Sequence, residues 1–201
     1  MKKKKILFVG GGTAGPAAPL LAVAETLKKE GRNFEALWIG TKKGPEAALV
    51  RAASIPFYSI HAGKWRRYAS VKNISDMFLT VLGFFEAFFF LMKHRPAVIA
   101  SAGGYVAVPI VLAGFVMGIP SCIHQQDAIP GLANRILAPF AKRVTVAFSE
   151  SAKFFSKKKT LVIGNPARSS LLAGDRARAL KKFGLEEGVP TVLALGGGTG
   201  A

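Results

Sequence analysis

Glycines at positions 10, 11, 12 and 15 separate a short apolar run, Ile6–Val9, from a segment with helical apolar periodicity, Leu20–Lys29. Glycine lets the backbone turn sharply and come close to a ligand. The N-terminus of a following helix points unpaired N–H groups at negative charge. Pro16 and Pro19 fit the first turn of that helix, where a missing N–H costs nothing. These residues predict a loop that binds phosphate through its backbone.

The spacing of Gly10, Gly12 and Gly15 also satisfies G-x-G-x-x-G, the pattern of dinucleotide-binding loops. Such a site needs an acidic residue at the end of the second strand, and the segment 38–43 contains none. Two lysines at the end of that segment could instead bind a 2′-phosphate, so an NADP-dependent oxidoreductase remains an alternative. A third alternative is a tight turn that only packs the helix on the strand.

Polar or glycine-bearing loops follow four further predicted strands, at residues 40–43, 101–105, 124–127 and 164–166. Ligands of open α/β sheets bind beyond the carboxyl ends of the strands, so we expect these loops to converge on one cleft. The predicted strands are Ile6–Val9, Phe34–Ile39, Phe57–Ile60, Ala97–Ala100, Ser121–His124, Arg143–Ala147 and Leu161–Ile163. The predicted helices are Leu20–Lys29, Pro45–Ala53, Ile74–Lys93, Val106–Met117, Gly131–Phe140 and Ser151–Phe155. This alternation predicts an α/β fold with a Rossmann-like parallel sheet.

The composition indicates anionic partners in a reducing compartment. Lys and Arg total 28 against 11 Asp and Glu, a formal charge of +17, which suits phosphorylated substrates, anionic lipid or nucleic acid. No nucleic-acid-binding motif accompanies the charge, so we expect no nucleic-acid partner. The single cysteine, Cys122, excludes an internal disulfide. The apolar run after Lys2–Lys5 is too short for a signal peptide, and we expect a soluble, cytoplasmic protein.

The end of the sequence repeats the pattern of its beginning. Residues 7–15 and 193–201 align without gaps, each with a strand-like run followed by glycines. A charged helical stretch without strand character precedes the second copy. We therefore expect a Rossmann-like domain at 1–168, a linker at 169–189, and at 190–201 the first strand and glycine loop of a second domain in which the sequence stops.

Several loops together resemble those of the family-28 glycosyltransferases. The matching segments are 11–15, 19–25, 40–46, 54–57, 103–106, 124–134, 164–168 and 196–201, in this order and spacing. The resemblance covers nearly all of the sequence. It implies the N-terminal portion of a two-domain GT-B enzyme that needs no nicotinamide, other cofactor or metal. The implied reaction is inverting transfer of N-acetylglucosamine from UDP-N-acetylglucosamine to lipid I, an undecaprenyl-diphosphate muramyl-pentapeptide, giving lipid II for peptidoglycan synthesis.

The resemblance also assigns substrate-binding positions. Thr13, Ala14 and Gly15 would border the substrate phosphates through backbone N–H groups, and Gly104 and Tyr105 lie in a second matching loop. Arg168 matches a residue that the family uses on the donor, where a guanidinium suits diphosphate or nucleotide oxygens. Gly198 would belong to the donor domain, where most donor contacts lie. We therefore expect residues 1–201 alone to be inactive.

Two positions depart from the family pattern. Pro16 occupies the place of a histidine that is proposed as base or substrate contact, and proline cannot take a proton. The loop that usually reads His-Glu-Gln-Asn is His124-Gln125-Gln126-Asp127 here. Inverting transfer needs a base, and we hypothesise that Asp127 supplies it, with His124 as a second candidate. The alternative is a binding homologue that has lost catalysis.

The segment Met77–Met92 is strongly apolar. It is predicted to form a helix whose polar residues, Asp76, Thr80, Gly83 and Glu86, share one narrow stripe. Its sixteen residues would reach ~24 Å, short of a bilayer core, so we expect it not to span a membrane. Basic residues flank it. Either the helix is sandwiched inside the protein, or Phe78, Phe84, Phe85 and Phe88 contact the anionic inner face of the cell membrane.

Overall fold

The computed structural model describes residues 3–42, 44–64, 72–171 and 173–194. A seven-stranded, fully parallel sheet lies at its centre, with the strand order β3-β2-β1-β4-β5-β6-β7. The strands are β1 (Lys4–Val9), β2 (Phe34–Gly40), β3 (Phe57–Ser59), β4 (Val98–Ser101), β5 (Ser121–Gln125), β6 (Arg143–Val146) and β7 (Thr160–Val162). The α/β fold and all seven predicted strands are confirmed, with ends that differ by one residue or two.

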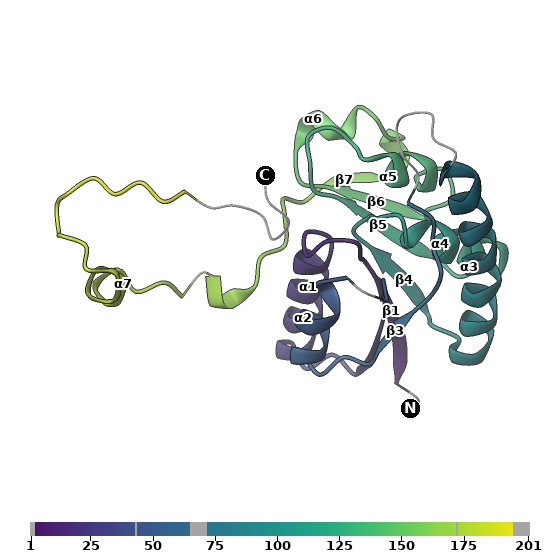
Figure 1. Cartoon of the computed structure of the whole chain (residues 1–201), viewed down its shortest axis with the longest axis horizontal. Helices are drawn as coiled ribbons and strands as arrows, with labels where there is room; N and C mark the ends of the chain where they lie inside the picture. Colours follow the sequence, from purple (N-terminus) through teal and green to yellow (C-terminus); the bar gives the residue numbers. More distant parts are fainter. Residues whose placement is uncertain (1–2, 43, 65–71, 172, 195–201) are drawn as a thin grey trace.

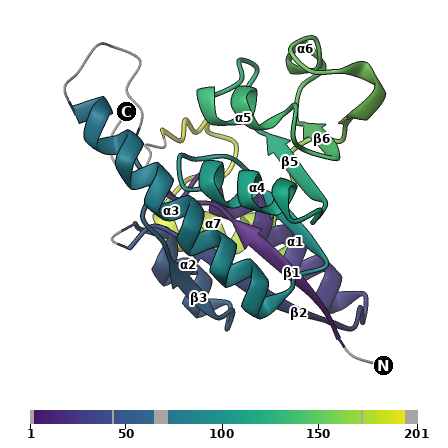
Figure 2. The ribbon, with the colours of Figure 1, turned by 90° about the vertical axis from the view of Figure 1, so that its right-hand side faces the viewer.

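Helices cover both faces of the sheet (Figure 1). One face carries α1 (Ala17–Lys29) and α2 (Glu46–Ala52), and the other carries α3 (Lys72–His94), α4 (Ala107–Val116) and α5 (Leu132–Leu137). Shorter helical segments are α6 (Ser149–Ala152), η1 (Lys157–Lys159) and η2 (Ser169–Leu171), and α7 (Arg176–Phe183) follows. Figure 2 shows α3 and α4 side by side in front of the strands.

The two-residue periodicity of the strands builds a separate core on each face. Leu7 and Val9 of β1 pack toward α3 and α4, whereas Phe8 packs toward α1 and α2. Trp38 of β2 joins Phe8 in the second core, where the two rings stack at 5.9 Å and the indole N–H donates to the carbonyl of Gly10 at 3.1 Å. This bond ties the start of the glycine loop to the neighbouring strand.

Helix α3 confirms the predicted helix Ile74–Lys93, with ends that differ by one residue or two. It has 23 residues, because the helix continues through the polar residues at both ends of the apolar run Met77–Met92. Within the described ranges one helix, residues 74–94, is long and apolar enough to cross a membrane by length and composition, which corrects the length expectation. The helix packs along α4, and Ala87 and Leu91 are fully buried in the core, so in this fold it forms one wall of the domain.

Helix α7 and the described residues after it lie apart from the sheet domain (Figure 1), whereas η2 contacts α1, where the Ser169 hydroxyl donates to Glu25 at 2.5 Å. Both segments agree with the predicted helical stretch. Residues 190–194 have no regular secondary structure, although a strand was expected to begin here. Val192 and Leu193 are exposed and pair with none of the described strands, and without such pairing no ladder of hydrogen bonds forms. The expected glycine loop at 196–200 lies outside the described residues.

Candidate functional site

A cleft of about 270 Å³ lies at the carboxyl ends of β1, β4 and β5. The chain order of the strands reverses between β1 and β4, and this is the position at which open α/β sheets bind ligands. The cleft is lined by Thr13, Gly15, Pro16, Ala102, Gly103, Gly104, Gln125, Gln126, Asp127, Gly131, Ala133 and Asn134. We call it the switch-point cleft. The predicted convergence is confirmed for the loops after β1, β4 and β5. It is wrong for the loops at 40–43 and 164–166, whose described residues Thr41, Lys42 and Pro166 line other hollows.

The first glycine loop borders this cleft through Thr13 and Gly15. Helix α1 begins at Ala17, and its first turn is closed by bonds from Ala17 and Ala18 N–H to the carbonyl of Ala14. Among the described residues, none accepts a hydrogen bond from the backbone N–H groups of Thr13, Ala14 or Gly15. These donors lie at the positive end of α1, the arrangement that binds anions.

Two glycines permit the close approach of the loops after β1 and β4. Gly12 has φ 92°, and a Cβ there would lie 2.8 Å from the ring of Tyr105. Gly104 has φ 87°, and a Cβ there would lie 2.5 Å from the carbonyl oxygen of Gly11. Side chains at either position would force the two loops apart and open the wall of the cleft.

A buried carboxylate, that of Glu46, holds the same loop through a hydrogen bond from the protein interior. Glu46 is completely buried at the start of α2, and its Oε1 accepts from the backbone N–H of Gly12 at 3.3 Å and of Thr41 at 2.7 Å. The Thr41 hydroxyl also donates to it, at 2.5 Å. Its Oε2 has no partner among the described residues. The Gly12 N–H is therefore occupied by the protein itself, whereas the N–H groups of residues 13–15 have no acceptor among the described residues.

The loop after β5 is shaped by two buried amides. Gln125, which is 2% exposed, donates its Nε2 to the carbonyl of Asp127 at 2.9 Å and to that of Ile129 at 3.4 Å. Its Oε1 accepts from Asn134 Nδ2 at 2.8 Å, and this amide also donates to the carbonyl of His124. A carboxylate at position 125 could not donate to these carbonyls. Glutamine at this position thus has a structural role that the sequence did not reveal.

The two candidate bases lie in different surroundings. Asp127 is exposed and lines the switch-point cleft. His124 is buried, and its ring nitrogens contact Thr145 Oγ1 at 3.0 Å and Asn165 Oδ1 at 3.2 Å. Burial lowers the pKa of His124, while its contacts with Asn165 and Thr145 act in the opposite direction. The ring lies against a separate apolar hollow on the α1 side of the sheet. This geometry favours Asp127 over His124.

Pro16, Thr13, Gly15 and Gly104 line the cleft as the sequence suggested, whereas other predicted site residues lie elsewhere. Ala14 supplies its carbonyl to the first turn of α1. Arg168 is exposed and borders a hollow between α1 and α2, near Glu25, Lys28 and Leu49. Burial and the charge of Glu46 raise the pKa of Tyr105, which borders a different hollow next to Thr41. Gly198 lies outside the described residues.

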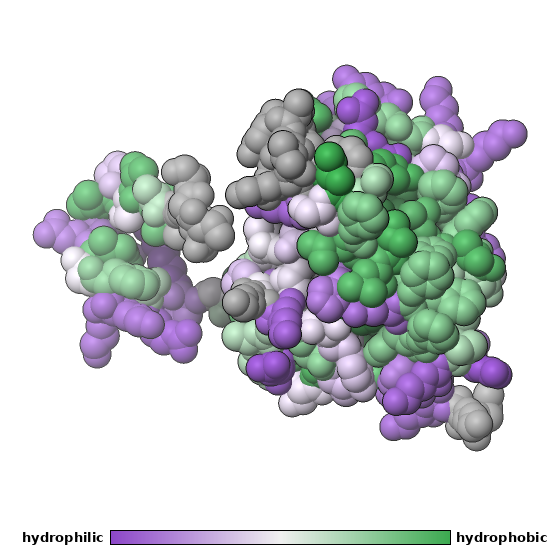
Figure 3. Space-filling view, turned by 45° about the vertical axis from the view of Figure 1, so that its right-hand side comes forward, coloured by the Kyte–Doolittle hydropathy of each residue, from purple (hydrophilic) through white to green (hydrophobic). Residues whose placement is uncertain are grey.

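The predicted membrane phenylalanines divide between two environments. Phe78 and Phe85 are 67% and 53% exposed, whereas Phe84 and Phe88 are half-buried and pack on the main core. The exposed apolar residues of α3, with two neighbours on α4, form what we call the α3 face: Ile74, Met77, Phe78, Leu79, Val81, Leu82, Phe85, Phe89, Met92, Phe115 and Val116. Figure 3 shows apolar side chains gathered over this side of the molecule.

Acidic, histidine and cysteine side chains do not gather into a metal-binding group of three anywhere in the part of the chain that the structure describes. The polar side chains among the residues that line the switch-point cleft are three amides, one hydroxyl and one carboxylate. This donor set suits a sugar or an anion held by hydrogen bonds.

Comparison with known proteins shows which family the residues around this cleft belong to. Residues 6–146 match the glycosyltransferase family 28 N-terminal domain. A relative from Bacillus anthracis is 41% identical over 198 residues, which are 98% of this chain and 56% of the relative. It is a UDP-N-acetylglucosamine–N-acetylmuramyl-(pentapeptide) pyrophosphoryl-undecaprenol N-acetylglucosamine transferase 2. The corresponding transferase of Clostridium perfringens strain SM101 is 41% identical over 201 residues, all of this chain and 56% of that protein. The chain thus spans about half the length of these curated relatives.

Solved structures show the same fold. The crystal structure of Acinetobacter baumannii MurG superposes with a TM-score of 0.68 at 32% identity, covering 82% of this chain and 46% of that one. A UDP-GlcNAc 2-epimerase from Neisseria meningitidis, bound to UDP-GlcNAc, gives a TM-score of 0.63 at 17% identity over 88% of this chain and 50% of its own. The second likeness concerns the fold alone. These matches do not favour the NADP-dependent oxidoreductase.

Proposed function

Because the chain belongs to glycosyltransferase family 28, whose N-terminal domain it contains, we propose that it forms the acceptor-binding half of an N-acetylglucosaminyltransferase. The donor is UDP-N-acetylglucosamine and the acceptor is a lipid-linked muramyl-pentapeptide diphosphate, as the names of the relatives state for those proteins. The observation that carries this proposal is the switch-point cleft, which is lined by Thr13, Gly15 and Asp127 and beside which the N–H groups of residues 13–15 have no acceptor among the described residues.

The proposed reaction is an inverting displacement. An acceptor hydroxyl oxygen attacks the anomeric carbon of N-acetylglucosamine, the bond from that carbon to the phosphate oxygen breaks, and UDP leaves. Asp127 takes the proton of the attacking hydroxyl, a role that its exposed position in the cleft permits. The N–H groups of Thr13, Ala14 and Gly15 stabilise diphosphate charge. Arg168 and Gly198 belong to the donor side in this proposal.

The lipid-linked acceptor requires the protein to work at a membrane surface. The α3 face supplies exposed apolar side chains, and Lys64, Lys93 and Arg95 flank it with positive charge. Exposed phenylalanines with a basic rim suit the boundary between head groups and acyl chains of an anionic bilayer. We place the protein on the cytoplasmic leaflet, held there peripherally by this face.

A chimera tests the transferase proposal. Residues 1–189 of this chain are joined to the remaining C-terminal part of the Clostridium perfringens relative, and transfer of radiolabelled N-acetylglucosamine to lipid I is measured. The chimera should form lipid II, and residues 1–201 alone should not.

Asp127→Asn in the chimera should lower kcat by about 10²- to 10⁴-fold, whereas His124→Gln should retain more activity. A folded chimera that binds lipid I without any transfer would indicate a homologue that has lost catalysis.

A further inference from the structure

Two buried side-chain amides connect α5 and β5 with the loop at 126–130, which we call the Asp127 loop. Gln125 is 2% exposed and Asn134 is 4% exposed. Asn134 Nδ2 donates to Gln125 Oε1 at 2.8 Å and to the carbonyl of His124 at 3.0 Å. Gln125 Nε2 in turn donates to the carbonyls of Asp127 at 2.9 Å and of Ile129 at 3.4 Å. We call Gln125 and Asn134 the amide pair, because their hydrogen bonds run in one direction, from α5 to the Asp127 loop.

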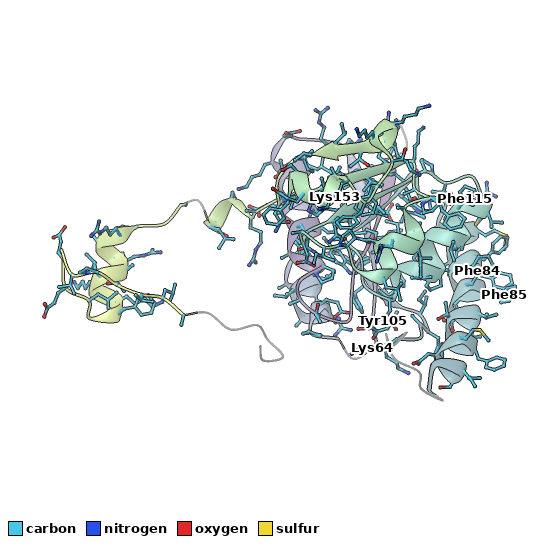
Figure 4. The ribbon with its side chains drawn as sticks, turned by 90° about the horizontal axis from the view of Figure 1, so that it is seen from above. Lys64, Phe84, Phe85, Tyr105, Phe115 and Lys153 are labelled. Atoms are coloured by element: carbon cyan, nitrogen blue, oxygen red, sulfur yellow. The ribbon has the colours of Figure 1, made fainter. Side chains whose placement is uncertain are left out.

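The orientation of both amides follows from their partners. Backbone carbonyls can only accept, so the nitrogen of Gln125 must point at the two carbonyls and its oxygen at Asn134. The nitrogen of Asn134 then has to point at Gln125. Its Oδ1 has no partner among the described residues and lies against the loop after β4, where a Cβ on Gly103 would be 3.2 Å away. That loop leads to Tyr105, on the side of the domain that carries Lys64 (Figure 4). Both amides therefore support the loop as hydrogen-bond donors.

Few other interactions hold the Asp127 loop. Asp127, Ala128 and Ile129 are exposed, so apolar burial does not fix them. No backbone group of residues 126–130 bonds to another backbone group of the described chain. The Asp127 carboxylate itself has no hydrogen-bond partner among the described residues. Its position therefore depends on the two carbonyls that Gln125 holds.

This dependence matters for the proposed reaction. Asp127 lines the switch-point cleft, where in our proposal it takes the proton of the acceptor hydroxyl. A general base must lie within hydrogen-bond distance of that proton. A displacement of about 1 Å at a reacting group can lower a rate by about 10²-fold. Loss of a donor from the amide pair would free the loop to move and would slow transfer while the base itself is still present.

We propose that Gln125 and Asn134 are positioning residues of the transfer reaction, which act by holding the Asp127 carboxylate at the switch-point cleft. The inference rests on the proposed function, because it requires Asp127 as the base. It requires an N–H donor at position 125 and at position 134, and a carboxylate of the same shape has none. Gln125→Glu and Asn134→Asp are therefore matched changes, since each removes the donor and keeps the volume of the side chain.

A double-variant cycle in the chimera tests this role. Gln125→Glu and Asn134→Asp should each lower kcat for lipid II formation by about tenfold to 10²-fold. The KM for lipid I should change by less than about threefold, because the base acts in the transition state. In a chimera that already carries Asp127→Asn, the same changes should lower kcat by less than about twofold, because no base is left to position.

Asn33→Asp is the control for this cycle. Asn33 is an exposed amide just before β2, at the opposite end of the sheet from the cleft, and its change should leave kcat as it is. Circular dichroism melting checks the fold of each variant, and either member of the amide pair is sufficient for the cycle.

The 201-residue chain allows a measurement that needs no transfer. In its NMR spectrum, the side-chain amide protons of Gln125 and Asn134 should exchange with solvent at least about tenfold more slowly than those of Gln126 and Asn33, because buried, hydrogen-bonded donors are protected. Equal exchange rates would overturn the inference.

The kinetic outcomes separate this inference from the reaction. Losses of kcat that multiply in full with the loss caused by Asp127→Asn would refute the positioning role alone, as would unchanged kcat in both Gln125→Glu and Asn134→Asp. A folded, unmodified chimera without any transfer would refute the reaction, and the positioning role with it.

Discussion

Glu46 connects the first two strand-end loops through a single carboxylate. Its Oε1 accepts from Gly12, from the Thr41 backbone and from the Thr41 hydroxyl, all in the interior. A Cβ at Gly11 would lie 2.5 Å from this carboxylate, and a Cβ at Gly44 would lie 1.9 Å from it. The shape of the glycine loop therefore depends on a side chain from another element.

Replacing Glu46 by alanine should leave these donors unpaired in a buried position. We expect Glu46→Ala to lower the free energy of unfolding by about 3 kcal/mol, measured by urea denaturation. Glu150→Ala serves as the control, because Glu150 is exposed, and should change this free energy by no more than about 0.5 kcal/mol. A loss below about 1 kcal/mol for Glu46→Ala would mean that the loop keeps its shape without the carboxylate.

His124 should make stability depend on pH. Burial lowers its pKa in the folded protein below the ordinary value of 6.5, so in mild acid the unfolded chain binds a proton that the folded chain does not. The stability contributed by neutral His124 is therefore complete above about pH 6.5 and is lost as the pH falls through the folded pKa. His124→Gln should flatten the dependence of unfolding free energy on pH between pH 7.5 and 5.

His94 provides the comparison for this measurement. Burial also lowers its pKa, so it contributes with the same sign, and its slope should persist in His124→Gln. If the single variant kept the full pH dependence of the unmodified protein, the assignment to His124 would be refuted.

Individual site residues were only partly predictable from the sequence. Thr13, Gly15 and Asp127 line the cleft as expected, because loops at the carboxyl ends of neighbouring parallel strands must meet. Glu46, Gln125 and Asn134 were missed as structural residues. Their roles include hydrogen bonds to residues 9 and 34 positions away, between Asn134 and Gln125 and between Gly12 and Glu46, which no local pattern reports.

At the scale of elements, local sequence patterns predicted the strands and helices. They did not predict which segment packs on the polar stripe of α3. Apolar runs of strand length predicted β1 to β7. In the interior of the sheet these runs reflect burial on both faces, whereas the edge strands β3 and β7 are largely exposed. The polar stripe of α3 was also visible in the sequence. Its partner was not, because the loop that it seats comes from residues 61–63, beyond β3 and more than ten positions before the stripe.

The two sides of α3 should respond differently to substitution. Phe85→Ser/Phe89→Ser changes residues that are 53% and 60% exposed, so the melting temperature should stay within a few degrees while binding to phosphatidylglycerol vesicles falls at least tenfold. Phe84→Ser/Phe88→Ser changes half-buried residues of the core and should lower stability by about 2–4 kcal/mol. Co-sedimentation with vesicles and thermal melting measure the two effects.

If the Phe85→Ser/Phe89→Ser variant bound vesicles as well as the unmodified protein does, the α3 face would not be the membrane contact. The matched core pair separates this outcome from general unfolding, because only that pair should lose both structure and binding.

At the scale of the whole molecule, the features divide among three regions. The sheet positions the switch-point cleft, the α3 face offers an apolar surface beside it, and α7 lies apart from both (Figure 1). The formal charge of +17 favours both a phosphorylated acceptor and an anionic bilayer. The relatives are nearly twice as long as this chain, and in our proposal most donor contacts belong to the part that it does not span.

Binding by the 201-residue chain itself tests the central claim, that this domain holds the acceptor. The ¹⁵N-labelled chain is titrated with a lipid I analogue that carries a shortened prenyl chain, and separately with UDP-N-acetylglucosamine. We predict that the analogue shifts the amide signals of Thr13, Gly15, Gly103 and Asp127, with an affinity at least tenfold higher than that of the sugar nucleotide. Saturable binding of UDP-N-acetylglucosamine at these amides, with no response to the analogue, would contradict the account.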